Sequence, residues 1–183
     1  MSAWVKRLAA TVVLLGNAGA HAALDVGEAA PQFTAQAAIA GNVIKYSLAD
    51  ELKKGPVVLY FFPLAFSHDC SIEAHNFAEA IEEYRALGAS VIGVSKDDID
   101  IQKRFSVSEC RGKFAVASDA DQSIMKSYDA VLFFRSEYAN RVSFVISPQG
   151  KIVYQYNSLN SAKHVENTMK ALKSWLKFGV VKW

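Results

Sequence analysis

The segment VVLYFFPLAFSHDC, residues 57–70, is an apolar run that leads directly into one of the two cysteines of the chain. Its β-branched and aromatic residues predict a buried strand, which Pro63 ends. Ser67 and Asp69 are both good N-cap residues, so a helix is expected to begin beside them. Cys70 then lies in or near the first helical turn, where unpaired backbone N–H groups and the helix dipole favour a thiolate. The segment therefore predicts a reactive thiol.

The rest of the chain alternates between strand and helix patterns on both sides of this segment. Helical spacing of apolar residues predicts helices over 71–87, from Asp98 to about Ser108, and over 119–128 and 161–177, with Gly88 ending the first of these. Apolar runs predict strands over 43–48, 57–62, 90–95 and 114–117, and a hairpin over 142–156 with its turn at 147–150. Alternating strands and helices of this kind are typical of a three-layer α/β domain.

The first 22 residues have the pattern of a secretory signal peptide. Lys6 and Arg7 precede a short apolar stretch, and Ala20-His21-Ala22 is a small-x-small cleavage site. The alternative is an uncleaved N-terminal anchor, but the apolar stretch is too short to span a bilayer stably. We therefore expect an exported, periplasmic protein whose domain comprises residues 23–183, with no stable membrane association after cleavage.

Charge and cysteine content exclude several classes of protein. The formal net charge is +2, and cleavage after Ala22 would remove two positive charges and bring it to zero, so nothing indicates nucleic-acid binding. Two cysteines, Cys70 and Cys110, are too few for a disulfide scaffold. His68 and His75 flank Cys70 without the regular ligand spacing of a metal site, so neither a metal nor another cofactor is expected.

The order of these segments resembles the peroxiredoxins, the alkyl hydroperoxide reductase/thiol-specific antioxidant family. Residues 63–70 are similar to the family signature Pro-x-x-x-Thr/Ser-x-x-Cys, and 26–33 to its opening segment. Further similar segments are the strand at 87–95, the Ser-Asp turn at 118–119 and the Arg-x-x-Phe-x-Ile strand at 141–146. The resemblance covers nearly all of residues 23–183. It is nearest to the single-chain type that includes the bacterioferritin comigratory proteins.

The resemblance implies a thioredoxin fold, a central mixed β-sheet flanked by helices, and thiol-dependent reduction of hydroperoxides. Residue by residue, it implies that Cys70 is the peroxidatic cysteine, Ser67 its hydroxyl partner, Pro63 a lid over the pocket and Arg141 the cation. Glu73 matches a glutamate often found three residues after that cysteine, or is simply an acidic residue in the first helical turn. Ser67 departs from the commoner threonine.

The sequence leaves the partner of Cys70 open. His75 stands where the commonest single-chain type has its second cysteine, and no cysteine lies near residue 183, which argues for a monomer or weak dimer. Cys110 lies in a polar stretch expected to be mobile, so it is a resolving thiol, a permanent disulfide partner or an unpaired thiol. The resolving role would require an external dithiol reductant such as a thioredoxin-like protein. The rival function is a thioredoxin-like redox sensor or binding module without peroxide turnover.

Overall fold

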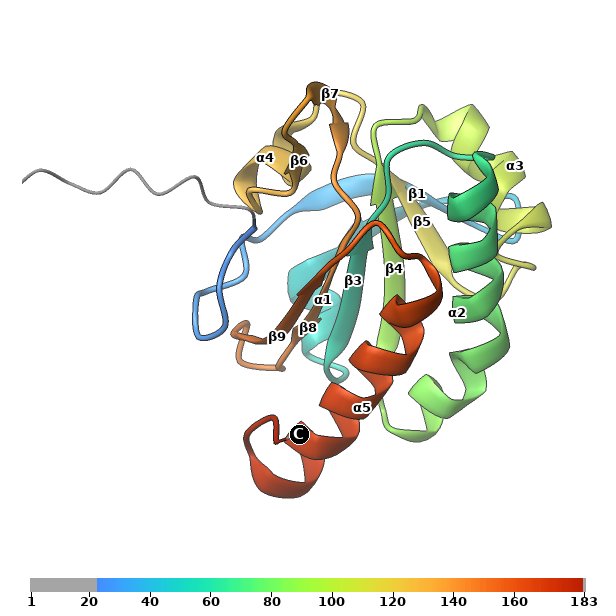
Figure 1. Cartoon of the computed structure of the whole chain (residues 1–183). Coiled ribbons are helices and arrows are strands. Elements are labelled where there is room, and N and C mark those ends of the chain that lie inside the picture. Colours follow the sequence, from blue (N-terminus) through green and yellow to red (C-terminus); the bar gives the residue numbers. More distant parts are fainter. Residues whose placement is uncertain (1–22, 183) are drawn as a thin grey trace, which may run out of the picture.

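The computed structural model describes residues 23–182, so the signal peptide expected at 1–22 lies outside the described residues. These residues form an α/β domain built on a central β-sheet (Figure 1). Within them, no helix has both the length and the apolar character needed to cross a bilayer. In chain order the elements are β1 (Thr34–Ile39), β2 (Asn42–Ser47), α1 (Leu48–Leu52), β3 (Val57–Phe61), α2 (His68–Ala86), β4 (Ser90–Ser95), α3 (Ile99–Ser108), β5 (Ala115–Ser118), α4 (Ser123–Ser127), β6 (Val131–Leu132), β7 (Arg135–Ala139), β8 (Val142–Ile146), β9 (Ile152–Asn157) and α5 (Ala162–Phe178).

The central sheet has seven strands in the order β2-β1-β5-β4-β3-β8-β9. Strands β3, β4 and β5 run parallel, whereas β8 is antiparallel to β3 and β9 is antiparallel to β8. On the other side, β1 pairs antiparallel with both β5 and β2. The predicted mixed sheet flanked by helices, a thioredoxin-like architecture, is therefore confirmed.

Strand β3 is buried along its whole length because helices cover both faces of the sheet. Its alternate side chains belong to two separate apolar clusters, since successive residues of a strand point to opposite faces. Val58 and Tyr60 pack with buried residues of α2 and α5, which lie side by side in Figure 1. Leu59 and Phe61 pack on the opposite face, with buried residues of α1 and α4. The carboxyl end of β3 is thus held from both sides at the point where the site begins.

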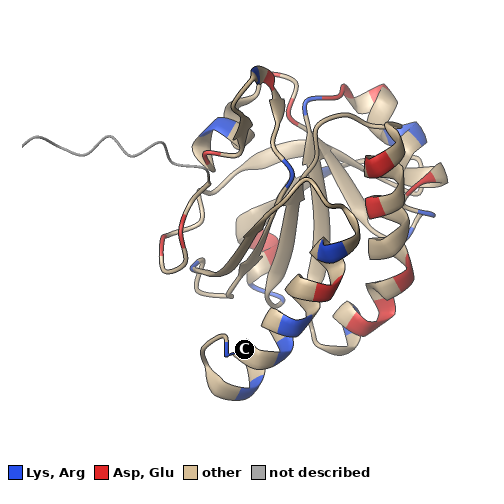
Figure 2. Cartoon of the chain, viewed as in Figure 1, with Lys and Arg blue, Asp and Glu red and all other residues tan. Residues whose placement is uncertain are grey.

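Charge complementarity accompanies the packing of the two long helices. Figure 2 shows acidic residues along α2 and basic residues along α5. Lys173 on α5 forms an ion pair with Glu83 on α2. Beneath this surface pair, the Tyr84 hydroxyl lies 2.7 Å from Thr168 Oγ1 and donates to the carbonyl of Val165 at 3.1 Å. These contacts fix α5 against α2, and with it the residues that α5 directs toward the first turns of α2.

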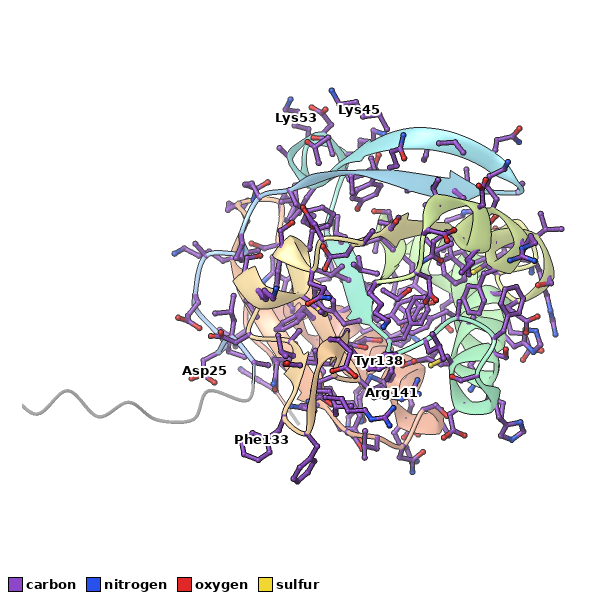
Figure 3. The ribbon with its side chains drawn as sticks, turned by 90° about the horizontal axis from the view of Figure 1, so that it is seen from above. Asp25, Lys45, Lys53, Phe133, Tyr138 and Arg141 are labelled. Carbon is purple, nitrogen blue, oxygen red and sulfur yellow. The ribbon has the colours of Figure 1, made fainter. Side chains whose placement is uncertain are left out.

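Several parts of the chain differ from the sequence prediction, among them the short helix α1, which was not predicted. Helix α4 begins at Ser123 and not at Asp119, because the Asp119 carboxylate accepts the backbone N–H groups of Ile124 and Met125 from a position before the helix. The β6–β7 hairpin was not predicted. Its turn exposes Phe133 at 84%, and Figure 3 shows that side chain at the edge of the molecule, so the segment lacks the buried periodicity from which strands are recognised.

Gly93 on β4 is required by the packing of a tyrosine on the neighbouring strand. A Cβ at Gly93 would lie 2.7 Å from Tyr60 Cζ and 2.8 Å from its hydroxyl oxygen. Tyr60 is fully buried and stacks on Phe77 at 4.4 Å, so the ring has no room to withdraw. We expect Gly93→Ala to reduce the free energy of unfolding by about 1–3 kcal/mol. Urea denaturation measures this loss.

The same substitution in a Tyr60→Val background is the matched control for Gly93→Ala. Without the ring there is no close contact, so adding Gly93→Ala to Tyr60→Val should reduce the free energy of unfolding by only a few tenths of a kcal/mol. A change of about that size is the usual deviation from additivity between independent sites. An equal loss in both backgrounds would mean that Tyr60 is not what requires glycine at this position.

Candidate active site

Cys70 is the third residue of α2 and lies in its first turn, as the sequence predicts. Beyond the end of β3 the backbone N–H of Phe62 donates to the carbonyl of Val94, which continues the pairing with β4 for one more residue. The chain then turns at the half-buried Pro63 and enters α2 after Ser67. The thiol is almost entirely covered, with 1% of the residue exposed. The helix start thus holds Cys70 beneath the loop formed by residues 63–67.

A buried carboxylate at the end of the adjacent strand holds this loop in place. Asp97 Oδ2 accepts the backbone N–H of Ala65 at 2.7 Å and the hydroxyl of Ser95 at 2.6 Å. Phe66 has a φ of +62°, a region that non-glycine residues occupy only when the surroundings enforce it. Asp97 was not among the residues singled out from the sequence. The available signal was its place just after a buried strand, since the carboxyl ends of parallel strands meet at one edge of a sheet.

Ser67 occupies the N-cap position of α2 but does not cap the helix through its side chain. Its hydroxyl instead donates to the carbonyl of Leu64 at 3.0 Å, inside the loop. Within residues 23–182 this is the one hydrogen bond of the Ser67 side chain, so no hydrogen bond joins that hydroxyl to Cys70 Sγ. The expectation that Ser67 is an N-cap is right in position and wrong in mechanism. Capping would need the hydroxyl oxygen to accept a backbone N–H of the first helical turn, whereas the hydroxyl is oriented by donating to the Leu64 carbonyl.

Arg141 is brought to Cys70 by the pairing of β8 with β3. Val142 lies opposite Phe61 in that pairing, so the residue before β8 lies next to the end of β3. The guanidinium donates from Nη2 to Cys70 Sγ at 3.3 Å and is almost completely buried. Figure 3 shows its side chain directed toward the start of α2. A buried cation at this distance favours the thiolate over the thiol because it is attracted only to the charged form.

Glu73 occupies the other side of the same guanidinium. It lies one helical turn after Cys70, is fully buried, and its Oε2 accepts a hydrogen bond from Arg141 Nη1. Burial raises the pKa of Glu73 to about 8, although Arg141 acts to lower it. Glu73 is more than an acidic residue of the first helical turn, because it lies beyond that turn and its buried side chain is paired with Arg141.

A histidine from α5 completes the buried cluster, and the sequence analysis missed it. His164 Nδ1 lies 3.5 Å from Glu73 Oε1 and 2.8 Å from Ser143 Oγ. Its Nε2 lies 2.8 Å from the carbonyl oxygen of Ser158. Burial lowers the pKa of His164 to about 4, and the charge of Arg141 acts in the same direction. The signal in the sequence was a histidine next to Val165, on the apolar side of an otherwise charged helix.

Cys110 is buried, which the polar stretch around it in the sequence does not indicate. Its side chain is fully buried, in the same apolar cluster as Cys70. After α3 the chain turns back, with the backbone N–H of Cys110 donating to the carbonyl of Phe105 at 3.1 Å, which directs the thiol inward. Burial raises the pKa of this thiol well above its usual value, and Glu109 adds to the effect. Both cysteines are free thiols in this structure.

Polar contacts on the outer side of α2 hold the segment that carries Cys110. His75 Nε2 lies 3.1 Å from Glu109 Oε2, and Arg111 Nη1 lies 3.3 Å from Glu79 Oε1. His75 is therefore the partner of an acid beside Cys110. Among the described residues no group of three or more His, Cys, Asp or Glu side chains is arranged to hold a metal ion.

Comparison with known proteins assigns this arrangement to a family. The family model described as AhpC/TSA matches residues 26–155. The chain belongs to the AhpC/TSA family. It is therefore a peroxiredoxin, a thiol peroxidase. The matched range contains Cys70, Glu73 and Arg141, whereas His164 lies beyond it.

Individual relatives agree with the bacterioferritin-comigratory-protein, or peroxiredoxin Q, type. The chain is 30% identical over 156 residues to 2-Cys peroxiredoxin BAS1 of Hordeum vulgare, with 81% of this chain and 74% of that protein covered. It is 30% identical over 149 residues to peroxiredoxin Q of Oryza sativa subsp. japonica, covering 81% and 66%. Both relatives are named as chloroplastic. The chain spans only 58% of the corresponding BAS1 proteins of spinach and Arabidopsis thaliana.

Solved structures share the fold. PrxQ from Xylella fastidiosa superposes with a TM-score of 0.76 at 22% identity, covering 86% of this chain and 99% of that one. Peroxidoxin BcpB from Mycobacterium tuberculosis superposes with a TM-score of 0.73 at 24% identity, covering 81% and 96%. The thioredoxin-like fold of the peroxiredoxins is thus confirmed.

Proposed function

We propose that Cys70 is the residue of this thiol peroxidase that reacts with hydroperoxides. Its thiolate attacks one oxygen of the peroxide, an S–O bond forms and the O–O bond breaks. The leaving oxygen takes up a proton and departs as water or an alcohol, and Cys70 becomes a sulfenic acid. The observation that carries this proposal is the 3.3 Å hydrogen bond from Arg141 Nη2 to Cys70 Sγ, between two almost completely buried residues.

The surrounding groups supply what thiolate formation alone does not. An ordinary thiol is already a few per cent ionised at neutral pH, so full ionisation gains only about thirtyfold in rate. The remaining acceleration must come from orienting the peroxide and stabilising charge on the leaving oxygen. Arg141 and the unpaired N–H groups at the start of α2 supply donors for this. Pro63 covers the pocket and Ser67 contributes its hydroxyl by turning away from the Leu64 carbonyl when peroxide is bound.

Cys110 is proposed as the resolving thiol. Its sulfur attacks the sulfenic sulfur of Cys70, an S–S bond forms and water leaves, and an external dithiol protein of the thioredoxin type then reduces the disulfide by exchange. Support comes from the membership of both thiols in one apolar cluster, on the inner side of α2. Because both are buried, the first turn of α2 or the segment after α3 must move for the bond to form. A permanent disulfide partner and an unpaired thiol are the alternatives.

The test uses limiting peroxide and intact-mass spectrometry on the reduced protein. The wild type is expected to lose two hydrogens as the disulfide forms, whereas Cys110→Ser gains one oxygen at Cys70. Cys70→Ser should eliminate the fast phase seen by stopped-flow mixing with hydrogen peroxide. If Cys110→Ser gives the same product as the wild type, Cys110 has no part in the cycle. A wild type that reacts no faster than free cysteine favours the redox sensor or binding module instead.

The setting of this activity is also a proposal. The charged and apolar pattern of residues 1–22 supports export to the periplasm, and N-terminal sequencing of protein recovered from that compartment should begin at Ala23. An N-terminus at Met1 or Ser2 would instead indicate the uncleaved form. The proposed cycle uses two cysteines of one chain, so a monomer or weak dimer is sufficient. Light scattering over a range of protein concentrations measures that state.

A further inference from the structure

Behind Arg141 lies a buried arrangement that the peroxide reaction itself does not use. It consists of Glu73 on α2, Ser143 on β8 and His164 on α5, and all three residues are fully buried. We call Glu73 and His164 the carboxyl–imidazole pair. Within residues 23–182, Glu73 Oε1 has no hydrogen-bond partner, although its other oxygen binds Arg141. A buried carboxyl oxygen without a donor is costly, so the protonation of this pair needs an explanation.

The contacts of the imidazole determine where its proton lies. The carbonyl oxygen of Ser158, 2.8 Å from His164 Nε2, can only accept a hydrogen bond, so Nε2 must carry a proton. In the neutral ring Nδ1 then has a lone pair, to which the Ser143 hydroxyl donates at 2.8 Å. The same lone pair faces Glu73 Oε1 at 3.5 Å. Two electron-rich atoms facing each other in the interior is an unfavourable arrangement.

One additional proton removes this conflict. If Glu73 is protonated at Oε1, its O–H donates toward His164 Nδ1, and the Ser143 hydroxyl then turns its proton away because that nitrogen has one lone pair. If the imidazole is protonated at Nδ1, it donates toward the carboxylate. In both cases a single proton lies between the same two atoms. Burial disfavours the charged form of each group, since it raises the pKa of Glu73 to about 8 and lowers that of His164 to about 4. Both shifts favour the arrangement in which the proton is on Glu73.

Other charged and titratable groups face the pair from the surrounding elements. Arg141 favours an ionised Glu73 and disfavours a protonated His164, whereas Asp69 on α2 favours a protonated Glu73. Tyr60 on β3 interacts electrostatically with Glu73 and with both cysteines, and burial raises its pKa well above the usual value. Tyr156 on β9 presents its ring to His164 at 4.8 Å. Arg141 is the one full cation in this set, and Cys70 and Glu73 compete for it.

We propose that His164 is a positioning residue of the thiol site, and that it acts by sharing one proton with Glu73. With the proton in place, Glu73 is not a full carboxylate toward Arg141, and the guanidinium charge is available to the Cys70 thiolate. When the proton is lost, Glu73 neutralises Arg141 and the thiolate loses part of its stabilisation. The proposal rests on the proposed function only because it takes Cys70 as the thiolate that Arg141 stabilises.

A double-mutant cycle between His164 and Glu73 tests the coupling. The readout is the pH midpoint of thiolate absorbance from Cys70, with Cys70→Ser as the blank. In His164→Asn the side-chain amide donates to Glu73 and stabilises its ionised form, so the midpoint for Cys70 should rise by about one pH unit. In a Glu73→Gln background the same substitution should leave the midpoint unchanged, because no carboxylate remains to compete for Arg141. His75→Asn, on the outer side of α2, is the matched histidine control.

The outcomes of the cycle separate a positioning role from a packing role. Equal shifts in both backgrounds would show that His164 acts through packing alone, and no shift in either would remove it from the site. Variants of His164 could fail to fold, so a second measurement uses the protein with His164 intact. At neutral pH the reduced wild type should show an infrared band of a protonated carboxyl that is missing in Glu73→Gln. Absence of this band, with Nδ1 unprotonated by nitrogen-15 NMR, would overturn the proposal.

Failure of this inference and failure of the proposed function can be told apart. The infrared and NMR measurements on Cys70→Ser report the shared proton in a protein that cannot react with peroxide through Cys70. A shared proton in a wild type that fails to react rapidly would contradict the proposed function alone. A rapid reaction without the shared proton would contradict this inference alone.

Discussion

Arg141→Met is expected to lower the second-order rate constant for oxidation of Cys70 by hydrogen peroxide by about 100- to 1000-fold, the usual loss when one donor to a developing oxyanion is removed. The guanidinium donates from Nη2 to Cys70 Sγ and from Nη1 to Glu73, and all three residues are buried. A methionine fills much of the same volume without charge or donors. Stopped-flow measurement under pseudo-first-order conditions gives the rate constant directly.

Arg135→Met is the matched control, because Arg135 is an exposed arginine on β7, six residues earlier in the chain. It removes the same formal charge and should change the rate constant by less than about twofold, since exposed charges are well screened. Arg141→Lys is informative as well, because one ammonium cannot hold Glu73 and Cys70 with the forked geometry of the guanidinium. A loss below about tenfold in Arg141→Met would contradict the role given to Arg141.

The free energy of unfolding of the Arg141→Met variant should depend on pH in a predictable direction. Without Arg141 the buried Glu73 loses the group that lowers its pKa, so that pKa rises further above about 8. The folded state then holds the Glu73 proton more tightly than the unfolded state does. The free energy of unfolding is therefore highest at acid pH and falls as the pH rises through the folded-state pKa. The kinetic comparison is best made at neutral pH, where Glu73 of the variant is neutral.

Phe77→Ala is expected to reduce the free energy of unfolding by about 3–5 kcal/mol, a large part of the total stability of an ordinary domain. Phe77 is fully buried two helical turns after Cys70 and on the same side of α2. Its ring stacks on Tyr60 at 4.4 Å and meets Phe114 edge-on at 6.3 Å. Truncation leaves a cavity between α2 and the sheet that rigid aromatic neighbours cannot fill. Urea denaturation followed by circular dichroism measures the loss.

Phe178→Ala is the control for this substitution, because Phe178 ends α5 with 49% of its surface exposed. We expect a change within about 0.5 kcal/mol there. A loss of about 1 kcal/mol or less in Phe77→Ala would mean that the interface between α2 and the sheet tolerates the cavity. In that event the packing of Phe77 is not what holds the Cys70 helix in place.

Much of the fold follows from local sequence patterns. Residues 57–62 are apolar at every position, and a strand of that kind must be covered on both faces, so β3 had to be central. The same segment supplies Pro63 and Ser67, which end the strand and begin the helix. The β6–β7 hairpin escaped prediction because an exposed turn has no apolar period. The burial of Cys110 could not be predicted, because neighbouring polar residues say little about which way one side chain points.

By itself, the sequence determined the α/β class, the strand that ends at Pro63 and the place of Cys70 in the first turn of α2, because strand and helix periodicity, breakers and N-caps are local properties of the chain. The tertiary structure alone decided what surrounds that thiol. Arg141 reaches Cys70 through the register between β3 and β8, and His164 reaches Glu73 because α5 packs on α2. Cys70 and Arg141 are 71 positions apart in the sequence, and Glu73 and His164 are 91 positions apart. Burial and pairing of charges at such separations depend on how whole elements pack, which no local pattern specifies.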